Sequence, residues 1–483
     1  MELKKLSLAA ALVAALGGLY GCSEGDEATV TVNSETTTTS GGTTSGGISQ
    51  TCPAFAIPKQ VDVDGNEVCA LPATILTDVT LTNDTVWLMQ GRVTVGNGNQ
   101  EMSVTEGILD SGDNVVNATL TIQAGTQVKA STGTFANLII TRGSKIDARG
   151  TAAAPIVFSS DDAGLDGTGE WGGLILHGFG NHNQCVAGSA CNIDSEGESG
   201  FAGGFTADDN SGVLQFVVVT EGGFEFAPGN EINGISLVGV GSGTTMDHIQ
   251  VNSNADDGLE FYGGAVNAKF LVLTGNVDDS VDWDEGYQGS LQYVIVKQTA
   301  DSGGNAIEAD TEGTTDFFSA PFIMNGTFIG AGSKDTLHVM KKSSGGFIFN
   351  SVMTGAAGTF ANCVDVNGSG AGANVATRLV YDNIIADCTN FTTAGSDAAA
   401  SNLTAGVNIQ AVAANLSSLL ASQAPEALLG APVDLTAFDD VLGDVNDNLT
   451  ADLDFLDATD YIGAVDPADT QGWFEGWTID GTL

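Results

Sequence analysis

Acidic side chains recur at matching positions in three short apolar segments of this chain. The segments read Leu-Glu-Phe-Tyr from position 259, Val-Asp-Trp-Asp from 281 and Ile-Glu-Ala-Asp from 307, and their acidic residues are Glu260, Asp282, Asp284, Glu308 and Asp310. If these segments are strands whose first residues point into a core, alternation places all five carboxylates on one outer face. Adjacent strands lie roughly 4.8 Å apart, so neighbouring carboxylates repel by about 1 kcal/mol in water and by more when desolvated.

An array of oxygen ligands favours a hard cation, and the loose spacing suits Ca²⁺ better than octahedral Mg²⁺. Asp278, Asp279 and Glu285 lie nearby in the sequence and extend the acidic region. We therefore predict that the five carboxylates bind Ca²⁺. The alternative is a solvated acidic face without a bound ion, and both interpretations stay open.

Paired carboxylates are also the catalytic groups of glycoside hydrolysis, so a carbohydrate-active enzyme is a second hypothesis. A lyase that acts on an acidic glycan also needs a basic group to take a proton and bind substrate carboxylates. The repeat region offers only lysines for this role, and no arginine lies between Arg149 and Arg378. Cleavage of an acidic glycan is therefore disfavoured, while hydrolysis of a neutral glycan stays open, with Tyr262 as a candidate for stacking on a sugar.

The strands that would carry these residues form an imperfect repeat. Apolar segments begin at positions 235, 259, 281, 307 and 337, and each is followed by a second apolar strand. A leucine-rich repeat would need a consensus that is absent here, and a propeller blade needs about 40 residues. Two corners with the pattern Asn-x-Asp-Asp, at 254–257 and 276–279, lie one period apart and would stack turn upon turn. This register favours a parallel β-helix over a β-sandwich, which is the alternative.

Several further segments stand in the same order as in a known family. They are Ala-Pro-Ile-Val-Phe at 154–158, Trp-Gly-Gly-Leu-Ile at 171–175, Glu-Ile-Asn-Gly at 231–234, Asp-Asp-Gly-Leu-Glu-Phe-Tyr-Gly-Gly at 256–264, Ala-Ile-Glu-Ala-Asp at 306–310 and Asp-Tyr-Ile-Gly-Ala at 460–464. With them the chain resembles largely uncharacterised surface lipoproteins of Gram-negative, often marine, bacteria. The resemblance implies an all-β fold, a right-handed parallel β-helix (solenoid). The family has no settled activity, so no catalytic residue is transferred.

The charge of the chain limits its partners. The 483 residues include 14 Lys plus Arg and 60 Asp plus Glu, which gives a formal net charge of −46. Such a surface repels nucleic acids and anionic lipid headgroups. We therefore expect no nucleic-acid partner.

The N-terminus has the pattern of an export signal. Lys4 and Lys5 precede a stretch of about ten apolar residues, which is too short to span a bilayer. The stretch ends in Leu-Tyr-Gly-Cys at Cys22, which resembles a bacterial lipobox. We predict a lipoprotein signal peptide over 1–21, a lipidated Cys22 and a flexible Ser/Thr/Gly tether over 22–50. Ser23, rather than an aspartate, favours the outer membrane, on its periplasmic or extracellular face.

The six remaining cysteines form three pairs that are close in sequence. They are Cys52 with Cys69, Cys185 with Cys191, and Cys363 with Cys388. An exported domain with an even number of cysteines is most simply explained by three disulfides. The alternative for the middle pair is a zinc site that also includes His177 and His182.

The predicted β-helix spans residues 51–396, and the composition changes over 397–483. Residues 408–421 have helical apolar spacing, and an acidic stretch with few strands follows. We predict a partly helical cap over the last turns of the solenoid, anchored by Trp473, Phe474 and Trp477, with a separate binding domain as the alternative. His248 and His338 are expected to be surface residues of strands.

Together these features predict an exported lipoprotein whose only membrane contact is its N-terminal lipid. Its acidic face would serve binding, adhesion or surface assembly with a glycan, an outer-membrane receptor or further copies of the chain. The alternative is a glycoside hydrolase or lyase-like enzyme on the same scaffold.

Overall fold

The computed structural model describes residues 52–61, 67–227, 231–311, 318–409, 453–466, 468–469 and 471–483. The chain divides into two units, Met1–Gly47 and Ile48–Leu483, and all of the described residues belong to the second. The predicted signal peptide, the lipidated Cys22 and the tether therefore lie outside the described residues.

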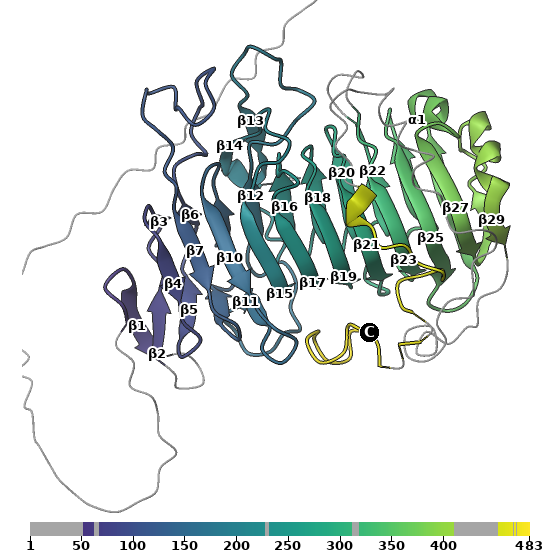
Figure 1. Ribbon diagram of the computed structural model, residues 1–483. Coiled ribbons are helices and arrows are strands. Elements are labelled where there is room, and N and C mark those ends of the chain that lie inside the picture. Colours follow the sequence, from purple (N-terminus) through teal and green to yellow (C-terminus); the bar gives the residue numbers. More distant parts are fainter. Residues whose placement is uncertain are drawn as a thin grey trace, which may run out of the picture. The chain divides into compact units, whose positions relative to one another are not determined.

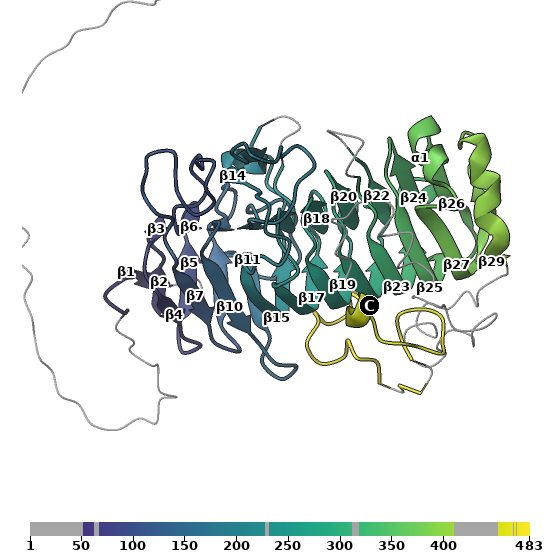
Figure 2. The same ribbon diagram turned by 45° about the horizontal axis from the view of Figure 1, so that its top comes forward.

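Strands of the second unit form two long sheets (Figures 1 and 2). Sheet A runs in the order β1 (Ile57–Val61), β2 (Glu67–Ala70), β5 (Val86–Met89), β8 (Gln127–Ala130), β11 (Ile156–Ser160), β15 (Gly212–Thr220), β17 (Thr245–Asn252), β19 (Asn267–Thr274), β21 (Ser290–Lys297), β23 (Phe322–Gly330), β25 (Gly346–Gly355), β27 (Leu379–Ala386) and β29 (Gly406–Ile409). It also includes a branch of β4 (Val79–Leu81), β7 (Thr119–Ile122) and β10 (Lys145–Arg149), in which β4 pairs with β7, β7 with β10, and β10 with β15.

Sheet B lies beside sheet A, and each turn of the solenoid contributes one strand to it. Its strands are β3 (Thr74–Ile75), β6 (Val93–Val95), β9 (Leu138–Ile140), β12 (Leu174–His177), β16 (Ile235–Val238), β18 (Leu259–Tyr262), β20 (Val281–Asp284), β22 (Ile307–Ala309), β24 (Thr336–Lys341), β26 (Phe360–Asn367) and β28 (Cys388–Thr392). Smaller elements are β13 (Ile193–Ser195), β14 (Gly200–Ala202), α1 (Ser369–Asn374) and the 3₁₀ helices η1 (Glu196–Glu198), η2 (Ala398–Ala405) and η4 (Leu453–Phe455).

The chain alternates between the two sheets, and successive strands within each sheet are parallel apart from the hairpin of β1 and β2. This is a right-handed parallel β-helix, as predicted. Apolar side chains from both sheets meet inside the coil, and Trp87, Trp171 and Trp283 are fully buried there.

The predicted register of sheet B holds over four turns. Ile235 pairs with Leu259, Leu259 with Val281, and Val281 with Ile307. The next turn is shifted by one residue, because Ile307 pairs with His338 rather than with Leu337. His338 is consequently buried, not exposed on the strand surface as expected, and its Nδ1 lies 3.1 Å from the Tyr381 hydroxyl.

The long strands of sheet A bend at one residue per turn that has a φ between 47° and 59°. These residues are Phe216, His248, Phe270, Tyr293, Asn325, Asn350 and Asn383, which we call the corner column. Left-handed backbone costs a side-chain-bearing residue roughly 1–2 kcal/mol. Ring stacking offsets part of this cost, since His248 lies 4.1 Å from Phe216 and 4.4 Å from Phe270 between ring centroids.

The C-terminal residues 453–483 pack along this corner column. Trp473 lies 5.1 Å from Phe270 and Trp477 lies 5.5 Å from His248 between centroids, and Phe474 and Trp477 are buried. The predicted aromatic anchors are thus in contact with the solenoid, but on its side rather than over its last turns. The predicted helix lies mostly outside the described residues, so the end cap stays a prediction for residues 410–452.

All three predicted disulfides are present. Cys52 is bonded to Cys69, Cys185 to Cys191, and Cys363 to Cys388, with Cα atoms 5.2–5.7 Å apart. The zinc alternative for Cys185 and Cys191 is therefore wrong, because their sulfur atoms are joined to each other.

Candidate functional site

The outer face of sheet B carries the predicted carboxylates in vertical register. Glu260 pairs with Asp282, and Asp282 pairs with Glu308 on the next strand. Tyr262 pairs with Asp284, and Asp310 follows at the same level because its N–H donates to Trp283 O at 2.8 Å. Strand alternation therefore gives two columns of polar side chains, as expected from the sequence.

Two lysines neutralise one end of these columns. Lys341, the last residue of β24, forms an ion pair with Glu308, and Lys342 forms one with Asp310 at 3.1 Å. Glu308 and Asp310 therefore have cationic partners within the chain. The remaining negative charge lies toward β18 and β20.

The corners before β18 and β20 add carboxylates at that end. Asp257, Glu260 and Asp282 each place one carboxylate oxygen within 4.8 Å of those of the other two, and so do Asp256, Asp257 and Asp278. The two triads share Asp257 and form what we call the acidic cluster. The structure thus joins Glu260 and Asp282 to Asp257, whereas Asp284, Glu308 and Asp310 lie on the same face outside the triads.

Stacked corners hold the aspartates in place. Asp257 Oδ1 accepts a hydrogen bond from Asp279 N at 2.9 Å, and Asn254 N donates to Asn276 Oδ1 at 3.2 Å. Gly258 leads into β18 where there is no room for a side chain, because a Cβ there would lie 2.5 Å from Asn276 Nδ2. The repeated Asn-x-Asp-Asp pattern was therefore a signal for clustered carboxylates as well as for corners.

Burial and mutual repulsion make the cluster hard to ionise. Burial is the main cause that raises the pKa of Asp257, Glu260 and Asp282 well above the ordinary range, and neighbouring carboxylates add to it. The same two causes raise the pKa of Asp256 to about 7. Without a cation, the cluster therefore holds protons near neutral pH.

Glu196 joins the cluster from a different part of the chain. Asn233 Nδ2 donates to Glu196 Oε2 at 2.9 Å and to Glu260 Oε2 at 2.5 Å, and the Tyr262 hydroxyl donates to Glu260. Burial raises the pKa of Glu196 to about 7, although its hydrogen bonds with Tyr262 and Asn233 oppose the shift. No local pattern pointed to Glu196, since it lies in an irregular segment far from the repeat.

One oxygen of the cluster lacks a hydrogen-bond partner among the described residues. Asp282 Oδ1 is buried and accepts no hydrogen bond there. A buried carboxylate oxygen without a donor is unfavourable unless a proton or a cation satisfies it. Ca²⁺ binds oxygen ligands at 2.3–2.6 Å, so two ligands of one ion lie up to about 5 Å apart, which fits the triads.

A third carboxylate group lies elsewhere on the solenoid. Asp162, Glu170 and Glu221 also place ligand oxygens within 4.8 Å of one another. Glu221 is fully buried, and its carboxylate accepts hydrogen bonds from Ser160 N at 3.2 Å and Gly167 N at 3.2 Å. These backbone donors satisfy Glu221 within the chain, whereas Glu170 Oε2 is buried and accepts no hydrogen bond among the described residues.

Comparison with protein families agrees with the observed architecture. Residues 111–427 match the model of a pectate-lyase-like β-helix domain. The chain belongs to this family. The pectate-lyase-like match spans the acidic cluster, and the segment that carries Glu196. Searches of the curated proteins and of the solved structures found no match. No helix among the described residues is long and apolar enough to cross a membrane.

Proposed function

We propose that this protein is an exported lipoprotein whose β-helix binds Ca²⁺ at the acidic cluster and uses that face for binding, adhesion or surface assembly. The observation that carries the proposal is the pair of triads sharing Asp257, with Asp282 Oδ1 buried and unpaired. A cation would neutralise carboxylates that otherwise repel one another in a poorly solvated site.

The cellular setting of the proposal comes from the N-terminal sequence. A lipid on Cys22 would hold the solenoid at the outer membrane, with no other membrane contact. Glycans, an outer-membrane receptor or further copies of the chain are the partners that fit, because a bound Ca²⁺ can bridge to the oxygen atoms of a ligand. The net charge of −46 argues against nucleic acid.

Calorimetric titration of the full-length, metal-free protein with Ca²⁺ tests this proposal. We expect stoichiometric binding, and a stabilisation of about 2.7 kcal/mol at a hundredfold excess over Kd. The Asp257→Asn variant removes the carboxylate shared by both triads and should lose most of the affinity, whereas Asp301→Asn, at an exposed position, should bind normally. Absence of binding heat and of any thermal shift in the wild type, at constant ionic strength, would refute the proposal.

A carbohydrate-active enzyme is the second candidate, and one observation favours it. Glu196 and Asp256 have pKa values of about 7, so either could donate a proton to a leaving group near neutral pH. The pectate-lyase-like family model also fits such a role. Screening the wild type for cleavage of glycans separates the two candidates. Turnover by the wild type that is lost in the Asp282→Asn variant would favour the enzyme over the binding module.

A further inference from the structure

The segment that supplies Glu196 is an insertion in the solenoid. It comprises residues 178–204 between β12 and β15, and contains the β13–β14 hairpin with η1 at its tip. The disulfide between Cys185 and Cys191 closes a short loop within it. Because Glu196 is the first residue of η1, its position depends on how this insertion is held.

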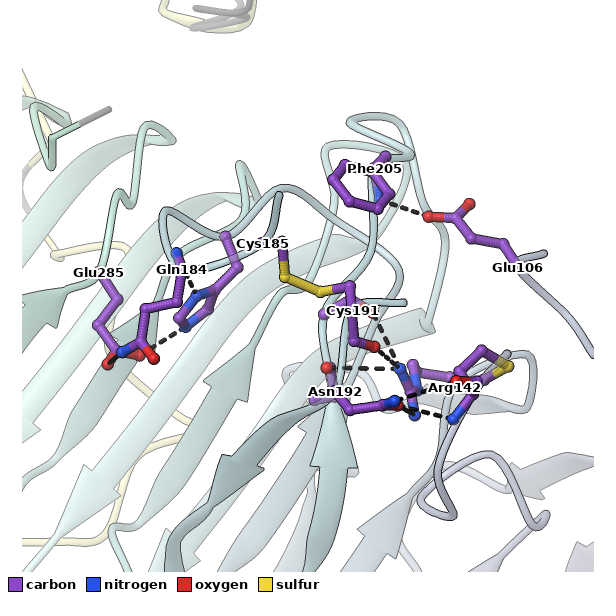
Figure 3. The surroundings of a disulfide bond; sticks show 12 residues. Glu106, Arg142, Gln184, Cys185, Cys191, Asn192, Phe205 and Glu285 are labelled. Atoms are coloured by element: carbon purple, nitrogen blue, oxygen red, sulfur yellow. Dashed lines mark hydrogen bonds and ion pairs between the residues drawn. A yellow bond between two sulfur atoms is a disulfide. The ribbon is translucent and has the colours of Figure 1, made fainter. Parts of the chain in front are cut away.

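Two arginines of earlier turns fasten the insertion. Arg142 is fully buried and donates to Cys191 O at 2.9 Å and Gly203 O at 3.1 Å, as well as to Gly98 O at 2.8 Å in its own part of the solenoid (Figure 3). Arg92 donates to Glu198 O at 2.7 Å, two residues after Glu196. Guanidinium groups bind several carbonyls at once in fixed directions, so they hold the backbone firmly.

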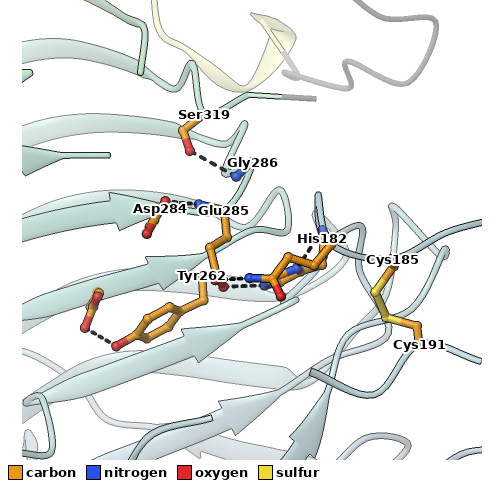
Figure 4. A network of polar contacts seen from close by, with 10 residues as sticks. His182, Cys185, Cys191, Tyr262, Asp284, Glu285, Gly286 and Ser319 are labelled. Atoms are coloured by element: carbon orange, nitrogen blue, oxygen red, sulfur yellow. Dashed lines mark hydrogen bonds and ion pairs between the residues drawn. A yellow bond between two sulfur atoms is a disulfide. The ribbon is translucent and has the colours of Figure 1, made fainter. Parts of the chain in front are cut away.

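A third attachment joins the insertion to the strand that carries Asp282. His182 Nε2 lies 2.5 Å from Glu285 Oε2, and Asn183 N donates to Glu285 O at 3.0 Å (Figure 4). Glu285 directly follows β20, and the His182 side chain is fully buried in this contact. The insertion is therefore attached both to earlier turns of the solenoid and to the turn that follows β20.

We propose that residues 178–204 form a positioning arm for the cation site, and that Glu196 sets the Ca²⁺ affinity of the site through Asn233 and Glu260. The inference rests on the proposed Ca²⁺ function. Asn233 bridges the arm and the solenoid, since one amide donates to both Glu196 and Glu260. Glu196 thus orients the Asn233 amide and adds negative charge beside Glu260. Partners of this kind, once removed, typically cost 10–100-fold in metal affinity.

Ca²⁺ titration of four full-length, metal-free proteins tests the inference. Glu196→Gln should weaken binding by about 10–100-fold. Glu198→Gln changes the charge equally at an exposed position two residues away, and should bind like the wild type. His182→Phe leaves every carboxylate of the cluster intact but removes the side-chain contact of His182 with Glu285, one of the contacts that hold the arm there, and should weaken binding by about tenfold.

The outcomes distinguish this inference from the function on which it rests. If the wild type binds no Ca²⁺, the proposed function fails. If the wild type binds and both Glu196→Gln and His182→Phe bind equally well, only the positioning arm is overturned. An equal loss in Glu198→Gln also overturns it, because the effect would then reflect net charge. Melting temperatures in chelator verify that each variant retains its solenoid.

Discussion

Replacing Asp284 by asparagine should stabilise the metal-free protein above pH 7. Asp284 ends β20, and burial, aided by the nearby carboxylates of Asp310 and Glu285, raises its pKa from about 3.8 to about 7. The folded state binds this proton more tightly than the unfolded chain, so its stability falls as pH rises from about 4 to about 7. The difference, 7 minus 3.8, is about 3 units, or about 4 kcal/mol at 1.4 kcal/mol per unit.

Partial solvent screening reduces this to about 2–3 kcal/mol. Asparagine keeps the acceptor for Glu285 N, which now donates to Asp284 Oδ1 at 2.5 Å, while it removes the charge. Urea denaturation in chelator at pH 4 and pH 8 measures the effect. The variant and the wild type should be equally stable at pH 4 and differ by the stated amount at pH 8, and Asp301→Asn serves as the exposed control. If the wild type and Asp284→Asn have the same free energy of unfolding at pH 8, the reasoning is refuted, because Asp284 is then well solvated.

Two further predictions concern the attached segments. Arg142→Ala removes the donors to the carbonyls of Cys191, Gly203 and Gly98, and should destabilise the insertion by about 3–5 kcal/mol. Faster amide exchange over residues 178–204 would measure this loss. Arg142→Lys should recover little of the stability, because lysine lacks the planar guanidinium group. Trp477→Ala removes the ring that packs on His248 and Phe216, and should speed proteolysis of residues 473–483. The core strands should keep their protection against amide hydrogen exchange, and an equal loss of protection throughout the protein would contradict this prediction.

The solenoid was predictable because its signals are local and repeat. Alternation within β18, β20 and β22 determines which side chains face outward, and the constant period places Glu260 above Asp282 and Asp282 above Glu308. The same reasoning failed at His338, where the turn before β24 shifts the register by one residue. The shift places His338 level with Ile307, and His338 is buried while Leu337 stays buried as well.

The remainder of the candidate site could not be predicted from the sequence, because it depends on contacts between distant parts of the chain. Glu196 meets Asn233 and Glu260 only after an insertion folds back onto sheet B, and the insertion is held by Arg142 and Arg92 from earlier turns. The ion pairs of Lys341 with Glu308 and of Lys342 with Asp310 likewise depend on how β24 pairs with β22 and where β24 ends. None of these contacts has a sequence period from which it could be inferred.

Burial separates the acidic cluster from the general acidity of the chain. A protein with a net charge of −46 could carry its acidic residues simply for solubility, but such residues gain most when they are hydrated. Asp257 and Glu260 are instead only 6% and 9% exposed, and they lie against other carboxylates. A carboxyl group in this setting either takes up a proton or lies beside a cation that neutralises its charge. Solubility alone does not explain why these carboxyl groups are buried together, whereas a cation site would explain it. The Ca²⁺ titration distinguishes these two explanations.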